Sequence, residues 1–153
     1  MILTEEMQKI MNLIQDDENN VFVTGKAGSG KTTFLKYLIE KSGKNCIVAA
    51  PTGIAAINAG GVTLHSLFGI PFGPITPYDR LENKFSEYKV ELLLKMELLI
   101  IDEISMVRAD LLDAIDSVLR RYRDRYKPFG GVQLLMIGDL QQLAPVVKET
   151  EWN

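Results

Sequence analysis

The sequence of 153 residues contains a single cysteine, Cys46, so it cannot form an internal disulfide or assemble a cysteine-rich zinc cluster. Cys46 begins an apolar run, and we expect its side chain to pack in the core. No apolar run approaches the length that crosses a membrane, and residues 1–6 are acidic where a secretory signal would be basic. We therefore expect an intracellular protein without membrane contacts, cytoplasmic in a bacterium and nuclear or mitochondrial in a eukaryote.

An excess of positive charge is also missing. The 17 basic and 20 acidic residues give a formal net charge of -3, so any surface that binds nucleic acid would have to be local. Hydrophobic residues make up 46% of the chain and charged residues 24%, which is typical of a soluble globular protein. A chain of this length can bury a core as one domain.

A glycine-rich segment of the form G-x-x-x-x-G-K-T follows a short β-branched run and leads into a helical pattern. Its residues are Gly25, Lys26, Ala27, Gly28, Ser29, Gly30, Lys31, Thr32 and Thr33. The glycines allow a tight turn whose backbone N–H groups point at phosphate oxygens, and the helix presents its positive end to the same anion. Lys31 is predicted to reach the β- and γ-phosphates and Thr32 to bind Mg²⁺. The sequence therefore predicts a nucleoside triphosphate ligand, and a chance glycine-rich turn is the alternative.

Hydrophobic periodicity predicts short strands that alternate with helices. Strands are predicted at 21–24, 46–50, 98–101 and 132–137, and helices at about 4–14, 31–41, 52–59 and 112–127. Residues 78–95 are mixed and charged and receive no assignment. This alternation predicts an α/β fold with a central parallel sheet covered by helices on both faces. The prolines and glycine between 71 and 77 predict a shaped loop.

Polar residues follow two of the predicted strands. Asp102, directly after the apolar run 98–101, fits the Walker B carboxylate that holds Mg²⁺, and Glu103 can accept a proton from an attacking water. An adjacent Asp-Glu pair is more typical of a hydrolase than of a kinase, although it could merely cap the next helix. Gln142 lies just beyond the last strand, where a neutral amide can orient water or sense the γ-phosphate.

Six segments together resemble one family. They are GKAGSGKTT at 25–33, APTGIAA at 50–56, GVTLHSLF at 61–68, IIDEISM at 100–106, KPFGG at 127–131 and GDLQQL at 138–143. This set resembles the Pif (petite integration frequency) family of superfamily-one DNA helicases, relatives of the RecD type. The resemblance implies a RecA-like P-loop NTPase domain that uses ATP and Mg²⁺ to move 5′ to 3′ along single-stranded DNA and to unwind duplexes.

The resemblance also assigns roles to individual residues. Lys31 and Thr32 would serve phosphate and magnesium, Asp102 and Glu103 would form the Walker B pair, and Gln142 would sense the γ-phosphate. Residues along the DNA backbone would be Pro51, Thr52, Gly53, Thr63 and His65, with Phe72 able to stack on a base. Small residues that pack a helix on the sheet, with His65 as a cap, are the alternative.

Further parts of the chain follow from the same resemblance. Residues 1–153 would be the first motor domain, with about 69–95 as an inserted wedge that separates strands at a fork, or else an inert surface loop. The partners would be single-stranded DNA, a duplex or G-quadruplex fork, and a second motor domain that this chain lacks, in a monomer. The family's adenine-selecting glutamine is replaced by Met7, which leaves a nucleotide contact by the next residue, Gln8, open. Ala144 also replaces the family's usual proline before Pro145.

Three interpretations remain open at this point. A P-loop nucleoside or nucleotide kinase would need a lid with arginines, and the Asp102-Glu103 pair argues against it. A non-enzymatic module gated by nucleotide is another possibility. The basic stretch 120–127 could bind nucleic acid, but cations at a helix C-terminus are stabilising in their own right, and we favour that interpretation.

Overall fold

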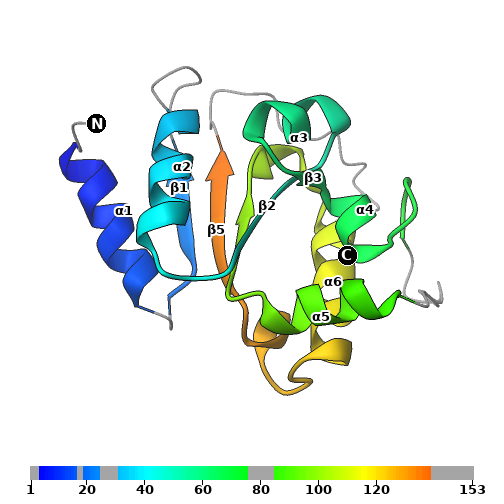
Figure 1. Cartoon of the computed structure of the whole chain (residues 1–153). Coiled ribbons are helices and arrows are strands. Elements are labelled where there is room, and N and C mark those ends of the chain that lie inside the picture. Colours follow the sequence, from blue (N-terminus) through cyan, green and yellow to red (C-terminus); the bar gives the residue numbers. More distant parts are fainter. Residues whose placement is uncertain (1–3, 17–18, 25–30, 76–84, 139–153) are drawn as a thin grey trace.

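The structure is a computed structural model that describes residues 4–16, 19–24, 31–75 and 85–138. Five parallel strands form one sheet in the order β1-β5-β4-β2-β3. The strands are β1 (Val21–Thr24), β2 (Cys46–Ala50), β3 (Val62–Thr63), β4 (Leu98–Ile101) and β5 (Gln133–Gly138). The helices are α1 (Glu5–Gln15), α2 (Lys31–Lys41), α3 (Gly53–Ala59), α4 (Leu64–Phe68), α5 (Glu87–Lys95) and α6 (Ala109–Tyr122), with short 3-10 helices η1 (Ile104–Met106) and η2 (Pro128–Gly131). Figure 1 shows their arrangement.

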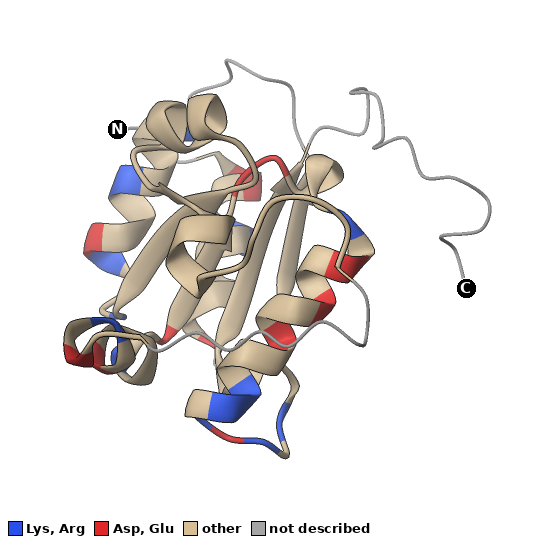
Figure 2. Ribbon diagram, turned by 90° about the vertical axis from the view of Figure 1, so that its right-hand side faces the viewer, with Lys and Arg blue, Asp and Glu red and all other residues tan. Residues whose placement is uncertain are grey.

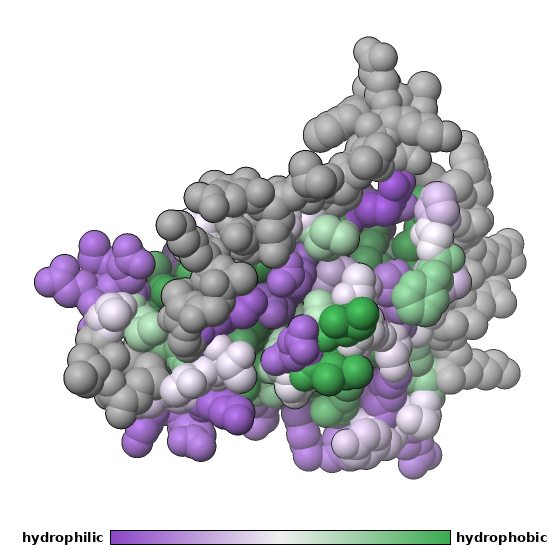
Figure 3. Space-filling view, turned by 90° about the horizontal axis from the view of Figure 1, so that it is seen from above, coloured by the Kyte–Doolittle hydropathy of each residue, from purple (hydrophilic) through white to green (hydrophobic). Residues whose placement is uncertain are grey.

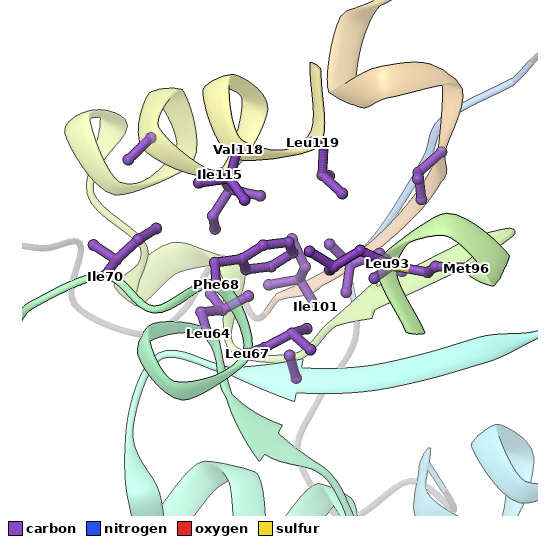
Figure 4. Close-up of a cluster of buried hydrophobic side chains, with 14 of the residues drawn as sticks. Leu64, Leu67, Phe68, Ile70, Leu93, Met96, Ile101, Ile115, Val118 and Leu119 are labelled. Carbon is purple, nitrogen blue, oxygen red and sulfur yellow. The ribbon is translucent and has the colours of Figure 1, made fainter. Parts of the chain in front are cut away.

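Two hydrophobic clusters lie on opposite faces of the sheet. Successive residues of β4 alternate between them, because side chains along a strand point to opposite faces. Leu98 and Ile100 pack with α1 and α2, whereas Leu99 and Ile101 pack with α4, α5 and α6. Phe68 lies fully buried in the second cluster, which Figure 4 shows in close-up. The predicted parallel sheet with helices on both faces is therefore confirmed.

Local chemistry fixes the helix ends near the carboxyl edge of the sheet. Thr4, Thr52 and Thr63 each accept a hydrogen bond from a backbone N–H in the first turn of α1, α3 and α4, at 3.1–3.2 Å. Gly60 ends α3 in the left-handed conformation at φ 74°, which costs glycine little because it has no Cβ. The predicted helix 31–41 and strands 21–24, 46–50 and 98–101 match the structure to the residue.

The predicted helix 112–127 ends earlier than the sequence suggested. α6 stops at Tyr122 because Arg123 leaves the helical conformation and its guanidinium donates to the carbonyls of Leu93, Leu94 and Gly130. Figure 2 shows the basic residues at this end of α6, at the opposite end of the molecule from the carboxyl ends of the strands. Arg120 also pairs with Asp116 at 2.9 Å. These contacts support a structural role for the basic stretch.

Residues 78–95, left without assignment from the sequence, contain α5. Ile70 and Leu93, near the two ends of the predicted wedge segment 69–95, are 3% and 0% exposed and belong to the same hydrophobic cluster. The ends of this segment are thus built into the core, and its role as a wedge stays a prediction. Within the described ranges no helix combines the length and the apolar character needed to cross a bilayer.

Gln133 joins the first helix to the sheet through a buried polar node. Gln133 is only 4% exposed, and its amide nitrogen donates to the carbonyls of Asp16 and Asn19 at 2.8 and 2.7 Å. Its amide oxygen accepts from Lys44 Nζ at 2.7 Å. Gln133 therefore ties Asp16 and Asn19, which lie between α1 and β1, to the first residue of β5.

Replacing Gln133 by leucine should lower the free energy of unfolding by about 2–3 kcal/mol, because the carbonyls of Asp16 and Asn19 and the ammonium of Lys44 each lose a hydrogen bond to a buried side chain. Urea denaturation of the wild-type and variant chains measures the change. Gln15→Leu, at the exposed end of α1, is the control and should change stability by less than about 0.5 kcal/mol. Equal losses in the two variants would contradict the role of this node.

Candidate nucleotide site and nucleic-acid interface

The strand order places the ends of β1, β4 and β5, after which the predicted site residues follow, next to one another. β5 lies between β1 and β4, with Thr24 opposite Gly138 and Ile101 opposite Met136. The glycine-rich segment after β1, the Asp-Glu pair after β4 and the segment that carries Gln142 therefore leave the sheet side by side. Gly25 to Gly30 and Gln142 themselves lie outside the described residues, so their roles stay predictions.

Lys31 and Asp102 form the contact at the centre of this edge. Lys31 Nζ lies 3.0 Å from Asp102 Oδ1, although the two residues are 71 positions apart. The Asp102 side chain is 4% exposed and that of Lys31 is 29% exposed. A buried carboxylate is costly unless it is paired and hydrogen-bonded, and here Lys31 and the backbone N–H of Glu103 both donate to it. The predicted convergence of Lys31 and Asp102 is present, and their roles toward phosphate and magnesium stay predictions.

Glu103 adopts a strained backbone conformation. Its φ of 55° and ψ of 46° lie in the left-handed region, which costs a residue with a Cβ roughly 1–2 kcal/mol. Its side chain makes no capping hydrogen bond to η1, so the alternative that the Asp-Glu pair merely caps a helix has no support. Strain of this kind persists where the surrounding structure enforces it, and active sites are common examples.

The residues at this edge fit a magnesium ion that is shared with phosphates. Thr32 lies exposed in the first turn of α2, and Asp102 directly follows β4. Their side chains carry the hard oxygen ligands that Mg²⁺ prefers. Among the described residues no group of three His, Cys, Asp or Glu side chains could hold a metal alone. A site with one carboxylate suits Mg²⁺, which usually keeps waters and substrate phosphates as its other ligands.

Gln8 lies on the exposed surface of α1. Its amide nitrogen donates to Asn12 Oδ1 at 3.1 Å, one helical turn along the same helix. The exposed position leaves the amide accessible, and a contact with adenine stays a prediction.

The predicted DNA contacts of the second and third motifs gather beyond β2 and β3. The last residue of β2, Ala50, pairs with the last residue of β3, Thr63, and Thr52 lies two residues beyond Ala50, so the two threonines lie at neighbouring strand ends. Each threonine hydroxyl accepts a helix N–H and still has its own O–H to donate. Gly53 begins α3 and is exposed, whereas Pro51 is buried against the sheet. Except for Pro51, this group offers neutral donors suited to phosphate.

His65 and Phe72 form a stacked pair. Their ring centroids are 4.2 Å apart with an interplanar angle of 22°, and Phe72 is 77% exposed. His65 Nδ1 is buried without a hydrogen-bond partner in the described structure, and burial lowers the pKa of this imidazole. The side chain of His65 therefore packs under Phe72 rather than capping α4, while Phe72 presents an open ring face.

The sequence analysis missed two exposed isoleucines beside Thr52. Ile54 and Ile57 on α3 are 77% and 80% exposed, while Ala56 on the same helix is 4% exposed. Figure 3, seen from above Figure 1, shows a hydrophobic patch on this face of the molecule. The alanine pair at 55–56 could have indicated this, because the small alanine side chain lets that face of α3 pack closely. Ile54 and Ile57 are three residues apart, so they share another face of the helix, which points outward.

A family model described as PIF1-like helicase matches residues 2–153. The chain belongs to the PIF1-like helicase family. Among curated relatives, the ATP-dependent DNA helicase RRM3 of Saccharomyces cerevisiae is 44% identical over 160 residues, which cover 99% of this chain and 22% of the yeast protein. The human ATP-dependent DNA helicase PIF1 is 39% identical over 152 residues, which cover 97% of this chain and 23% of the human protein.

Solved structures of PIF1 helicases share the fold. A crystal structure of Bacteroides sp Pif1 in complex with ADP-AlF4 matches with a TM-score of 0.91 and 86% identity, over 99% of this chain and 35% of that one. The Pif1 helicase from Candida albicans matches with a TM-score of 0.77 and 37% identity, over 97% of this chain and 35% of that one. The chain thus spans about a fifth of the length of the curated PIF1-like relatives and a third of the solved ones.

Changing Glu103 to glycine should give a protein about 1 kcal/mol more stable than changing it to alanine, because glycine adopts a positive φ without a Cβ penalty. The comparison is made by urea denaturation of the two variants. Glu91, exposed in the interior of α5, provides the control pair: there glycine should be less stable than alanine by about 1 kcal/mol. The same order at both positions would show that Glu103 is not strained.

Proposed function

We propose that this chain is the first RecA-like motor domain of a DNA helicase that couples ATP hydrolysis to 5′-to-3′ translocation on single-stranded DNA and to duplex unwinding. The observation that supports it best is the 3.0 Å contact between Lys31 at the start of α2 and the buried Asp102 at the end of β4. This pairing suits phosphoryl transfer, since both groups face the edge from which the glycine-rich segment leaves β1.

The residues at this edge divide the work in the proposed reaction. Lys31 neutralises charge on the β- and γ-phosphates, and Thr32 and Asp102 hold magnesium. A bound magnesium ion supplies further neutralisation of the phosphate oxygens. Glu103 accepts the proton of the attacking water. We assign the cradle of the triphosphate to residues 25–30 and the sensing of the γ-phosphate to Gln142.

The proposed DNA track lies beyond β2 and β3. Thr52, Gly53 and Thr63 offer hydroxyl and backbone donors, which hold phosphates without reading bases. Phe72, exposed over His65, offers a face on which one base can stack. A structure of Bacteroides Pif1 bound to single-stranded DNA supports this choice of partner, as does a structure that describes unwinding at forked double-stranded DNA by two coordinating Pif1 helicases. We extend the proposal to G-quadruplex forks on the family resemblance alone.

A second motor domain is part of the proposal. Helicases of this kind hydrolyse ATP in the cleft between two domains, where arginines of the second domain complete the charge around the γ-phosphate. The relatives are three to five times as long as the part matched here, which leaves room for such a domain.

Expressed alone, the 153-residue chain should bind nucleotide and single-stranded DNA weakly and show little ATPase activity and no unwinding. Fluorescent ADP and a labelled oligonucleotide measure the two affinities, and a forked duplex measures unwinding. Robust unwinding by this chain would contradict the need for a second domain. Transfer of phosphate to a nucleoside in the same preparation would favour the kinase alternative.

In the full-length gene product, Glu103→Gln should reduce the rate of ATP hydrolysis by about 100-fold or more while nucleotide binding stays within about twofold, because only proton acceptance is lost. Steady-state phosphate release and nucleotide titration measure the two effects. Glu97→Gln, at an exposed residue before β4, is the control and should leave both unchanged. Normal unwinding by Glu103→Gln would favour a nucleotide-gated binding module over a motor.

A further inference from the structure

Asp110 joins two segments that are far apart in the sequence. It lies in the first turn of α6, where its Oδ1 accepts from the backbone N–H of Leu111 at 2.9 Å and from Arg108 Nε at 3.2 Å. Its other oxygen, Oδ2, accepts from the backbone N–H of Ile75 at 2.9 Å, across 35 residues. One oxygen therefore serves the start of the helix and the other holds the proline-rich loop.

Asp110 is an anionic anchor. Its side chain is 23% exposed. Burial alone would raise the pKa of this carboxyl, but the hydrogen bond from Ile75 and the Arg108 guanidinium outweigh burial and lower it. A carboxylate that accepts hydrogen bonds holds them more strongly than a neutral oxygen does.

The loop that Asp110 holds is the one that carries Phe72. Ile75 packs its side chain against the hydrophobic cluster of α4, α5 and α6, and Phe72 stacks on His65 of α4. The described part of the loop, residues 71–75, is thus attached at two points, one on α4 and one on α6. The attachment to α4 is an aromatic contact, and the attachment to α6 includes the charged hydrogen bond.

The residues that precede Asp110 in the chain form a short connection to Glu103 at the nucleotide edge. Only η1 and Val107 to Ala109 separate it from Glu103, and two backbone hydrogen bonds of 3.0 Å, Met106 to Glu103 and Val107 to Ile104, tighten this turn. Ile104 packs closely on the end of β5, since a Cβ added to Gly138 would lie 2.8 Å from Ile104 Cγ2. The turn has little room to move independently of the strand ends.

We infer that Asp110 is a positioning residue that couples the nucleotide edge to the loop 71–75, so that rearrangement around Asp102 and Glu103 is passed through η1 and the start of α6 to the segment that carries Phe72. This inference rests on the proposed function. In this proposal the Asp110 carboxylate, at the start of α6, couples the position of loop 71–75 to ATP hydrolysis.

Asp110→Ala tests the inference in the full-length gene product. ATP hydrolysis stimulated by single-stranded DNA should stay within about twofold, whereas the number of base pairs unwound per ATP should fall about tenfold, a size typical of coupling between two sites. Asp110→Asn has one acceptor oxygen in place of two, so it can accept from Ile75 or at the start of α6 but not at both, and its unwinding yield should lie between those of the wild-type protein and Asp110→Ala. The assays are phosphate release and strand separation on a forked duplex, measured in the same samples.

Asp116→Ala is a matched control on the same helix. Asp116 has a similarly exposed side chain, at 27%, and it too accepts from a distant backbone N–H, that of Phe129 at 2.6 Å. This variant loses a comparable hydrogen bond, but one that holds η2 and not the loop 71–75. The number of base pairs that it unwinds per ATP should therefore stay near the wild-type value.

Hydrogen exchange gives a direct reading of the anchor. The amide of Ile75 should exchange faster in Asp110→Ala by about tenfold or more, and its rate should be unchanged in Asp116→Ala, because one lost hydrogen bond opens one amide. If Asp110→Ala does not purify as folded protein, Asp110→Ser replaces it: the serine hydroxyl can still accept a hydrogen bond at the start of α6, but the side chain lacks the second oxygen that holds Ile75.

Three results would overturn the inference. They are an unchanged unwinding yield in Asp110→Ala despite faster exchange at Ile75, an equal loss in Asp116→Ala, and an unchanged exchange rate at Ile75. Failure of the proposed function is seen separately, because the wild-type protein would then neither hydrolyse ATP in response to DNA nor unwind the fork.

Discussion

A buried carboxylate at the end of a fully buried strand is the constraint on which the site depends. Every residue of β4 is buried, and Asp102 continues it with a side chain that is only 4% exposed. Such a charge is stable only with a cation and hydrogen-bond donors close by. The parallel sheet supplies them, because β1 and β4 end at the same edge and the helix after β1 begins with Lys31. The pair that stabilises this edge of the fold is thus also the pair to which we assign contacts with phosphate and magnesium.

At the same edge of the sheet, residues that stabilise the fold also carry polar groups that a ligand could contact. Thr52 and Thr63 stabilise the starts of α3 and α4, and each hydroxyl keeps a hydrogen to donate. Glu103 is held in a strained conformation by the tight turn of η1 behind it. Capping and strain here have the same consequence: polar groups are fixed in position before any ligand arrives, which limits the entropy lost on binding.

The sequence predicted the sheet and the meeting of Lys31 with Asp102 well because the signals for the strands and their ends are local. Val21 to Thr24 and Leu98 to Ile101 are short apolar runs bounded by polar residues, and the strand ends are set by that change in character. The sequence did not predict the end of α6, since Arg123 leaves the helix for carbonyls of α5 thirty residues away. The contact of Asp110 with Ile75 could not be predicted from the sequence either. An acid in the first turn of a helix is already explained by its favourable interaction with the helix dipole, so it does not indicate a distant partner.

The acidic net charge of -3 is consistent with the neutral groups of the proposed DNA track. Cations that could have formed a basic surface are engaged in the fold: Arg120 pairs with Asp116, and Arg123 binds three carbonyls at the end of α6. The groups beyond β2 and β3 are threonine hydroxyls, backbone amides and an exposed ring instead. Neutral donors release no counterions when they bind phosphate, so they hold DNA less tightly than lysine or arginine would. Weak contacts of this kind suit the proposed motor, which must release each nucleotide in order to move along the strand.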